Sequence, residues 1–129
     1  GDDHGILGIF TNDGSQAAFV PDSETGKAVG FAAGADAGIG TTYNVMLPQF
    51  LELYKNFKEG NVDKAREIQM KINKVIGLMI KYEVITSTKH MCKMLGYDVG
   101  NATYPLKNFT SDQAAKFEEE LKQIGWPFN

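Results

Sequence analysis

The sequence predicts an α/β fold in which helices dominate, because two parts of the chain differ in composition and in periodicity. Residues 1–44 are rich in glycine, alanine and aspartate, and residues 45–129 are rich in lysine, glutamate, leucine, isoleucine and methionine. Short apolar runs bounded by turn residues, typical of strands, lie in the first part, and apolar residues recur at helical spacing in the second. Within the first part, segment 34–44 is apolar and glycine-rich and ends in hydroxyls and an amide. This is the pattern of a barrel strand that carries polar groups to a site at its carboxyl end.

The N-terminal part holds the expected strands. Residues 6–10 form a short apolar run, and residues 11–15 have the composition of a turn. Residues 16–33 are ambiguous, because a strand over 17–20 and a helix starting near 21 both fit. Residues 36–42 predict a buried strand whose glycines allow a backbone or a ligand to approach closely.

The second part begins with two expected helices. Pro48 suits a first helical position, and that helix runs to Gly60. Asn61 is a good N-cap for the next helix. An apolar stripe at helical spacing predicts the buried face of that helix, and it comprises Ala65, Ile68, Ile72, Val75, Ile76 and Met79.

Two further helices follow. One is expected over 86–95 and stops at Gly96, a typical residue just past a helix end. Residues 103–106 predict an extended linker, because residues before proline favour that conformation. Thr110 and Gln113 predict a capping box for the last helix, which ends at Gly125. Its buried face is expected to hold Phe117, Leu121 and Ile124.

Composition excludes several classes of function. A net charge of −3 without a basic stripe argues against nucleic-acid binding. No apolar run approaches the ~18 residues of a membrane span, and the acidic start does not resemble a signal peptide. The single cysteine, Cys92, excludes an internal disulfide, predicts a buried inert thiol and fits a cytoplasmic location. A chain without an initiating methionine is expected to be a fragment or a processed product.

No metal site and no cofactor are predicted. His4 and His90 lack partners at metal-ligand spacing, and the default for each is a solvated or core histidine. Lys89 is expected to extend its ammonium group to solvent or to an ion pair. The glycines of segment 34–40 lack the spacing of a dinucleotide-binding loop. The five methionines are expected to fill the core, namely Met46, Met70, Met79, Met91 and Met94.

Segment 34–44 reads G-A-D-A-G-I-G-T-T-Y-N and resembles one strand of the N-acetylneuraminate lyases, G-A-D-x-G-I-G-S/T-T-Y-N. These enzymes are pyruvate-dependent class I aldolases related to dihydrodipicolinate synthase. Residues 34–125 look like the C-terminal part of such an enzyme. The resemblance implies the eighth strand and helix of a (β/α)8 TIM barrel, then a three-helix extension. A whole barrel needs about 250 residues, so we expect a partial barrel over 1–60 and a helical extension over 61–129.

The resemblance implies reversible cleavage of N-acetylneuraminate to N-acetylmannosamine and pyruvate through a lysine Schiff base, in a homotetramer without a cofactor. It places Thr41, beside Gly40, against the sugar chain of the substrate. Thr11 matches a substrate-contacting threonine. Glu24, or Asp22 if a small insertion is allowed, falls near a family carboxylate pair that binds sugar hydroxyls.

The resemblance also exposes a gap. The family lysine belongs between residues 9 and 10, in a strand similar to segment 5–13, and this sequence has no residue there. Either the lysine is lost or residues are missing from the sequence.

Three interpretations therefore stay open: a sialic acid lyase, a dihydrodipicolinate synthase-type aldolase using aspartate semialdehyde, and a non-catalytic barrel remnant or interaction module. The Thr-Tyr-Asn ending of segment 34–44 favours the first over the second. Strand 36–42 is apolar and carries no proline, so we expect other strands to pair with it.

Overall fold

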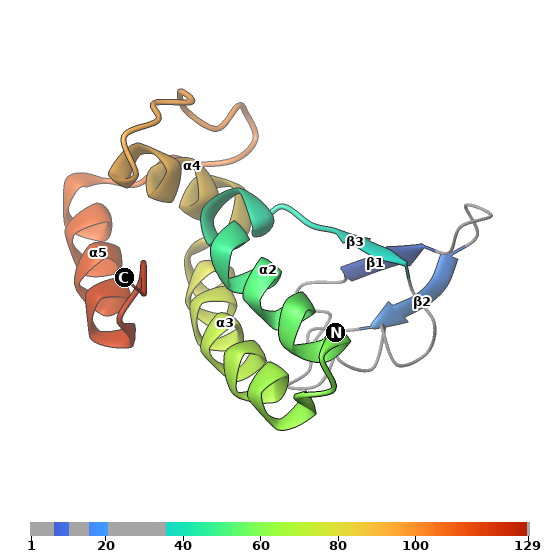
Figure 1. The fold of residues 1–129 in the computed structure, drawn as a ribbon. Helices are drawn as coiled ribbons and strands as arrows, with labels where there is room; N and C mark the ends of the chain where they lie inside the picture. Colours follow the sequence, from blue (N-terminus) through green and yellow to red (C-terminus); the bar gives the residue numbers. More distant parts are fainter. Residues whose placement is uncertain (1–6, 11–15, 21–35, 129) are drawn as a thin grey trace.

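The computed structural model describes residues 7–10, 16–20 and 36–128, which form a small sheet beside a group of helices (Figure 1). The predicted α/β fold with dominant helices is confirmed. In chain order the elements are β1 (Leu7–Phe10), β2 (Gln16–Val20), β3 (Ala37–Ile39), α2 (Tyr43–Lys58), α3 (Val62–Tyr82), α4 (Val84–Met94) and α5 (Ser111–Ile124).

The three described strands form an antiparallel sheet in the order β2-β1-β3. The strands of a (β/α)8 barrel are parallel, so this sheet differs from the predicted barrel sector. Residues 11–15 alone separate β1 from β2, and so short a connection permits an antiparallel pair but not the crossover that parallel strands need.

The pairing of β1 with β2 is irregular at one point. Ile9 pairs with Ala18 but Phe10 pairs with Gln16, so Ala17 of β2 has no partner in β1. An extra residue on one strand of an antiparallel pair is a β-bulge. Between residues 9 and 10, strand β1 therefore has one residue fewer than the segment of β2 that faces it.

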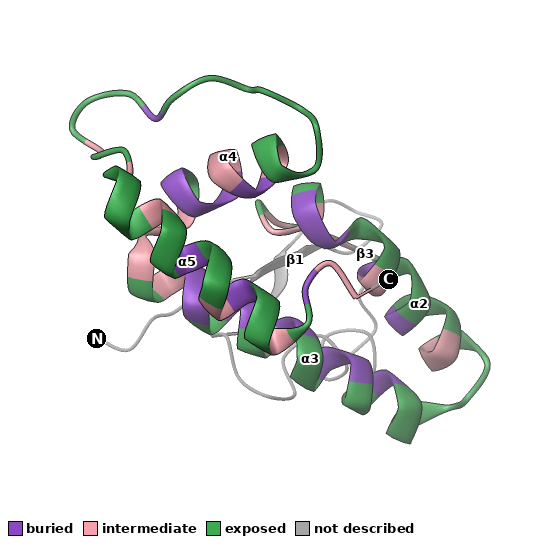
Figure 2. Ribbon diagram, turned by 90° about the vertical axis from the view of Figure 1, so that its left-hand side faces the viewer, coloured by how far each residue is buried: buried purple, intermediate pink, exposed green. Residues whose placement is uncertain are grey.

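Helix α3 is the centre of the helical core, and it contacts α2, α4 and α5. Its predicted apolar stripe is confirmed, since all six residues are buried (Figure 2). The other helices add Val45, Met46, Phe50, Leu53, Met91, Phe117 and Leu121 to this core. Burial of these side chains, at roughly 25 cal/mol per Å² of apolar surface, is what holds the helices together.

The methionine prediction is confirmed for three residues and wrong for two. Met46, Met79 and Met91 are fully buried, whereas Met70 and Met94 are exposed at the surface. Ile124 is half-buried against the core, as its place at the end of α5 allows.

Helix α2 starts five residues before the predicted position at Pro48. Its first turn is separated from the rest by non-helical angles at Met46 (φ −139°, ψ 25°). A proline ring clashes with the carbonyl four residues earlier, so a helix does not run straight through it. Pro48 therefore lies in the first turn of the straight segment, where the missing N–H is tolerated.

The other helix ends follow the predicted signals, with one addition. The capping box of Thr110 and Gln113 is present, and Gly96 and Gly125 have positive φ angles of 95° and 99° after α4 and α5. Asn61 precedes α3 but makes no side-chain cap bond. The addition is Glu83, whose carboxylate caps α4.

Residues 103–106 do not form the predicted extended linker. The Leu106 N–H donates to the Thr103 carbonyl at 3.0 Å, which closes a turn. The loop that contains this turn is tied to α4 by a bond from Thr86 Oγ1 to the Lys107 carbonyl at 2.8 Å. Tertiary contact with α4 therefore decides the shape of this segment.

The chain end returns to the start of α2. Trp126 is buried and its Nε1 donates to the Val45 carbonyl at 3.1 Å. Gln49 Nε2 donates to the Pro127 carbonyl at 3.2 Å. These two bonds join residues 126–127 to the N-terminal half of α2.

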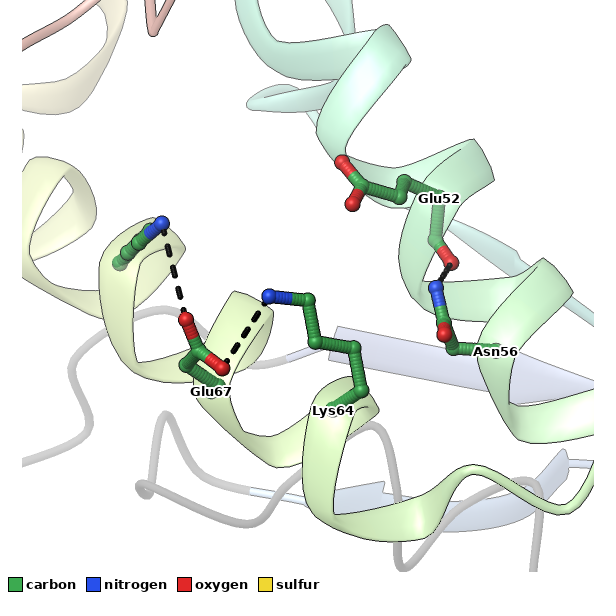
Figure 3. Close-up of polar contacts among 5 residues, drawn as sticks. Glu52, Asn56, Lys64 and Glu67 are labelled. Carbon is green, nitrogen blue, oxygen red and sulfur yellow. Dashed lines mark hydrogen bonds and ion pairs between the residues drawn. The ribbon is translucent and has the colours of Figure 1, made fainter.

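Polar contacts near the lower ends of α2 and α3 are local to each helix (Figure 3). Lys64 Nζ lies 3.2 Å from Glu67 Oε2, and Asn56 Nδ2 donates to the Glu52 carbonyl at 2.9 Å. Exposed pairs of this kind contribute roughly 0–1 kcal/mol. The packing of α2 against α3 therefore depends on the buried apolar residues.

Candidate functional site

The candidate site is the junction between β3 and α2. Three successive backbone bonds turn the strand into the helix, from Tyr43, Asn44 and Val45 to the carbonyls three residues earlier, at 3.1, 3.2 and 3.2 Å. Asn44 Nδ2 also donates to the Thr41 carbonyl at 2.9 Å. The amide predicted at the end of the strand thus holds the junction in a tight turn.

Thr41 and Gly40 lie in this turn, as their position after strand β3 predicts. The Thr41 side chain is exposed, and it is the backbone carbonyl of Thr41 that accepts from Asn44. Thr42 is the N-cap of α2 and makes no side-chain cap bond. Thr42, and not Thr41, is thus the cap residue of α2. The exposed hydroxyl of Thr41 can both donate to and accept from a bound molecule.

Tyr43 holds the strand against the helix. Its hydroxyl lies so close to Gly38 that a Cβ there would clash with it, and its ring packs on Phe50 with centroids 4.3 Å apart. Burial raises the pKa of Tyr43 to about 12, because the charged phenolate loses solvation there. The close approach predicted for the strand glycines occurs at Gly38, and the approaching group is this tyrosine.

A groove of about 380 Å³ runs beside the junction between β3 and α2. Most of its lining is apolar, and Asp36 lies in it as a carboxylate. The sequence predicted strand 36–42 to be buried, and this is wrong, since Ile39 is 67% exposed. A barrel strand is buried between helices and neighbouring strands, and the antiparallel sheet leaves β3 without that cover.

The other predicted site residues lie outside the described residues. These are Thr11, Glu24 and the alternative Asp22. Of the predicted site residues, the structure describes Thr41 and Gly40, which lie together in the junction. That Thr11 and Glu24 join them in one site stays a prediction. The position expected for the family lysine, between residues 9 and 10, coincides with the irregular pairing in β1.

A second hollow of about 490 Å³ lies between α4, the loop after it and α5. Lys89 lines it and donates through Nζ to the Val99 carbonyl at 3.2 Å, rather than forming the ion pair that was one of two expectations. His90 Nε2 lies 2.8 Å from Glu118 Oε1, and its ring packs against Phe109. The side chains of Lys89 and His90 thus both make contacts within the fold.

Cys92 packs against the core but is half-buried, so the thiol is less buried than predicted. The part of the chain that the structure describes contains no group of three His, Cys, Asp or Glu side chains that could hold a metal ion. Among its helices, none combines the length and the hydropathy needed to cross a membrane.

The chain resembles known proteins over most of its length. The model of the dihydrodipicolinate synthetase family matches residues 22–124. An N-acetylneuraminate lyase of Citrobacter koseri is 47% identical over 97 residues, which are 75% of this chain and 32% of that protein. N-acetylneuraminate lyase 2 of Escherichia coli O6:H1 is 36% identical over 98 residues, 73% of this chain and 32% of that protein.

Two solved structures share the fold over about four fifths of this chain. Proteus mirabilis N-acetylneuraminate lyase superposes with a TM-score of 0.73 and 28% identity, covering 80% of this chain and 35% of that one. The enzyme from Aliivibrio salmonicida also gives 0.73, at 18% identity, and covers 81% of this chain and 35% of that one. The chain spans about a third of the length of these relatives. Because the family model matches residues 22–124, the chain belongs to the dihydrodipicolinate synthetase family.

Proposed function

We propose that the chain is the C-terminal portion of a pyruvate-dependent class I aldolase that cleaves N-acetylneuraminate to N-acetylmannosamine and pyruvate. Residues 1–60 would contribute to the barrel and residues 61–129 would form its helical extension. The observation that carries the proposal is the β3–α2 junction, which presents an exposed Thr41 beside Gly40 in a tight turn. The relatives named above are N-acetylneuraminate lyases, which supports the choice of substrate.

In this reaction a lysine amine condenses with the 2-keto group of the sugar acid and releases water. The hydroxyl beside the breaking carbon–carbon bond loses its proton, the sugar aldehyde departs, and the protonated imine takes up the bonding electron pair to become an enamine. A proton added to the enamine carbon restores the imine, and hydrolysis of this imine releases pyruvate and the lysine amine. The role of Thr41 is to hold the sugar chain by a hydrogen bond. The sequence has no lysine between residues 9 and 10, so we expect no cleavage by these 129 residues alone.

A chimera tests the proposal. Residues 34–124 of this chain replace the aligned segment of the Citrobacter koseri lyase, and cleavage of N-acetylneuraminate is measured. We expect activity, and we expect Thr41→Ala to lower kcat/KM by about fivefold, since a lost hydrogen bond costs roughly 1 kcal/mol. Thr41→Ser should keep most of the activity, and Thr103→Ala, an exposed threonine in a loop, is the control.

The outcomes are distinct. A folded chimera that does not act on N-acetylneuraminate contradicts the proposal. Condensation of pyruvate with aspartate semialdehyde by that chimera would support the dihydrodipicolinate synthase-type alternative. A tetrameric assembly and a cytoplasmic location stay predictions.

A second candidate is a non-catalytic barrel remnant. The specific observation in its favour is that β1 is one residue shorter than β2 where the family lysine is expected. Under both candidates the 129 residues alone form no imine with the substrate. Under the first, the β3–α2 junction supports cleavage once it is part of a complete barrel, and under the second it does not.

A further inference from the structure

Helix α2 is broken near its start, and the break separates its first turn from the rest of the helix. Met46 has non-helical angles there, and Pro48 has no N–H to donate to the carbonyl four residues earlier. The first turn continues directly from the turn that holds Thr41. The angle at the break therefore decides where Thr41 lies relative to the straight segment of α2.

Two residues at the other end of the described chain are bonded to both sides of this break. Before the break, the Val45 carbonyl accepts from Trp126 Nε1 at 3.1 Å, in a buried bond. After the break, Gln49 Nε2 donates to the Pro127 carbonyl at 3.2 Å. Residues 126–127 thus lie beside α2 (Figure 2) and restrain the angle between its two segments.

The end of α5 holds Trp126 in place. The N–H of Gly125, a residue with a φ of 99°, donates to the Lys122 carbonyl at 3.0 Å, and the Trp126 N–H donates to the Leu121 carbonyl at 3.2 Å. These two bonds form the Schellman motif that ends many helices. Since Trp126 and Leu121 are also buried in the same core, both backbone bonds and packing fix the indole.

We propose that Trp126 is a positioning residue for the β3–α2 junction. The link is Val45, whose carbonyl accepts from the indole and whose N–H donates to the Thr42 carbonyl at 3.2 Å. Through Val45, the indole sets the first turn of α2 and with it the place of the Thr41 hydroxyl. The effect on the substrate rests on the proposed function, whereas the restraint on the junction does not.

Family membership does not assign this role. The family model matches residues 22–124, and Trp126 lies just beyond them. The argument for Trp126 comes from the bonds that it makes in this chain.

Hydrogen exchange in the complete 129-residue chain tests the restraint. Trp126→Phe keeps an aromatic ring at this position and removes the indole N–H. We expect the amides of residues 43–45, which close the junction, to exchange about fivefold faster, the change that loss of one typical hydrogen bond produces. The increase is measured relative to the amides of Ile72 and Val75 in the core of α3, which are expected to open with the whole fold.

Phe117→Leu is the matched control. Phe117 is a buried aromatic residue of α5 whose ring contacts are with Tyr82, His90 and Phe109. Its replacement should speed exchange in α3 and at the junction alike. Gln49→Met removes the second bond across the break and should act selectively on the junction, as Trp126→Phe does. Because Gln49 is half-buried, this variant keeps the test decisive if Trp126→Phe does not fold.

A double-mutant cycle tests the effect on the site, in the chimera extended to residue 128 so that it contains Trp126. Trp126→Phe should lower kcat/KM for N-acetylneuraminate by about threefold, through KM rather than kcat, because the Thr41 hydroxyl is then held less firmly. In a Thr41→Ala background the same substitution should have little further effect, since the indole acts through that hydroxyl.

Two results would overturn the proposal. One is exchange at the junction that rises no more than exchange in α3, which would make Trp126 an ordinary core residue. The other is an equal loss of kcat/KM with and without the Thr41 hydroxyl. A folded but inactive chimera counts against the proposed function alone, and selective exchange at the junction would then still support the restraint by Trp126.

Discussion

At the residue scale, the contact between Gly38 and Tyr43 decides how strand β3 meets helix α2. The sequence indicates that something approaches the backbone at the strand glycines, but it does not identify the group. The structure shows that the group is the hydroxyl of a tyrosine five residues later. Since this contact adjoins the turn that holds Thr41, it positions the proposed substrate contact.

A double-mutant cycle tests this contact. Gly38→Ala should destabilise the fold by about 1–3 kcal/mol, because the new methyl group meets the Tyr43 hydroxyl. With Tyr43→Phe the nearest ring carbon is 3.5 Å from that methyl group, an ordinary contact, so the same substitution should then cost little. Urea denaturation measures both.

Gly77→Ala is the control for the effect of glycine itself. Gly77 is helical, with nothing within 4 Å of an added Cβ, and the substitution should stabilise the protein by roughly 0.5–1 kcal/mol. If Gly38→Ala is equally destabilising with Tyr43 and with Phe at position 43, the steric explanation is wrong.

The half-buried phenol of Tyr43 predicts a loss of stability in alkali. Burial raises its pKa from 10.0 to about 12, so the folded state holds the proton more tightly than the unfolded chain. The stabilising contribution is complete below pH 10 and disappears as the pH rises toward 12. The pKa of Tyr82 is also raised, chiefly by its hydrogen bond to Glu120. Phenolate absorbance during alkaline titration should therefore show a late component that Tyr43→Phe reduces, and a late component of unchanged size in that variant would contradict the assignment.

At the element scale, local signals define the helix ends more reliably than the strand partners. The capping box at Thr110 and the glycines after α4 and α5 occur where the sequence places them, because a cap involves residues within one turn. The cap of α4 is different. Glu83 has a positive φ of 97° and accepts from the N–H groups of Ile85 and Thr86 at 2.9 and 2.7 Å, a geometry that the sequence pattern does not indicate.

Glu83→Gln tests this cap. Burial acts to raise the pKa of Glu83, but the hydrogen bonds from the Thr86 and Ile85 backbone outweigh it and leave the pKa below 4.5. The carboxylate therefore stabilises the fold above the pKa of the unfolded chain, and this contribution is lost as the pH falls through the folded pKa. At pH 7 the variant should lose about 1 kcal/mol of unfolding free energy, near the middle of the range for caps.

The matched control is Glu59→Gln, since Glu59 is exposed just after α2 and contributes its backbone rather than its side chain to that helix end. Thermal unfolding from pH 3 to 7 should show the difference between the Glu83 variant and the parent shrinking in acid. A difference that is independent of pH would indicate that the cap does not depend on the charge.

At the scale of the whole molecule, the helices and the sheet differ in what the sequence could predict. The core around α3 could be predicted from periodicity, because Ile72, Val75 and Met79 lie on the same face of the helix whatever that face packs against. The sheet depends on which strands are available, and here β1 pairs with β2 and β3 in antiparallel fashion. A barrel would need parallel neighbours that the described strands do not provide.

The absence of the family lysine predicts that the chain forms no Schiff base with pyruvate. Incubation with pyruvate and borohydride should leave the intact mass unchanged, because no residue occupies the position between Ile9 and Phe10. The Citrobacter koseri lyase, treated in parallel, is the positive control and should gain one reduced pyruvate. A mass above that of the 129 residues that rises further on trapping would falsify the view that these residues lack the nucleophile.

The sequence by itself determined the helical stripes, most helix ends, the α/β class and the resemblance of segment 34–44 to a lyase strand. These depend on residues close together in the chain, whose spacing carries the signal. The tertiary structure alone decided the antiparallel sheet, the exposure of Ile39, the capping by Glu83 and the contact of Tyr43 with Gly38. Each of these depends on which distant backbone or side chain lies nearby, and periodicity does not encode that.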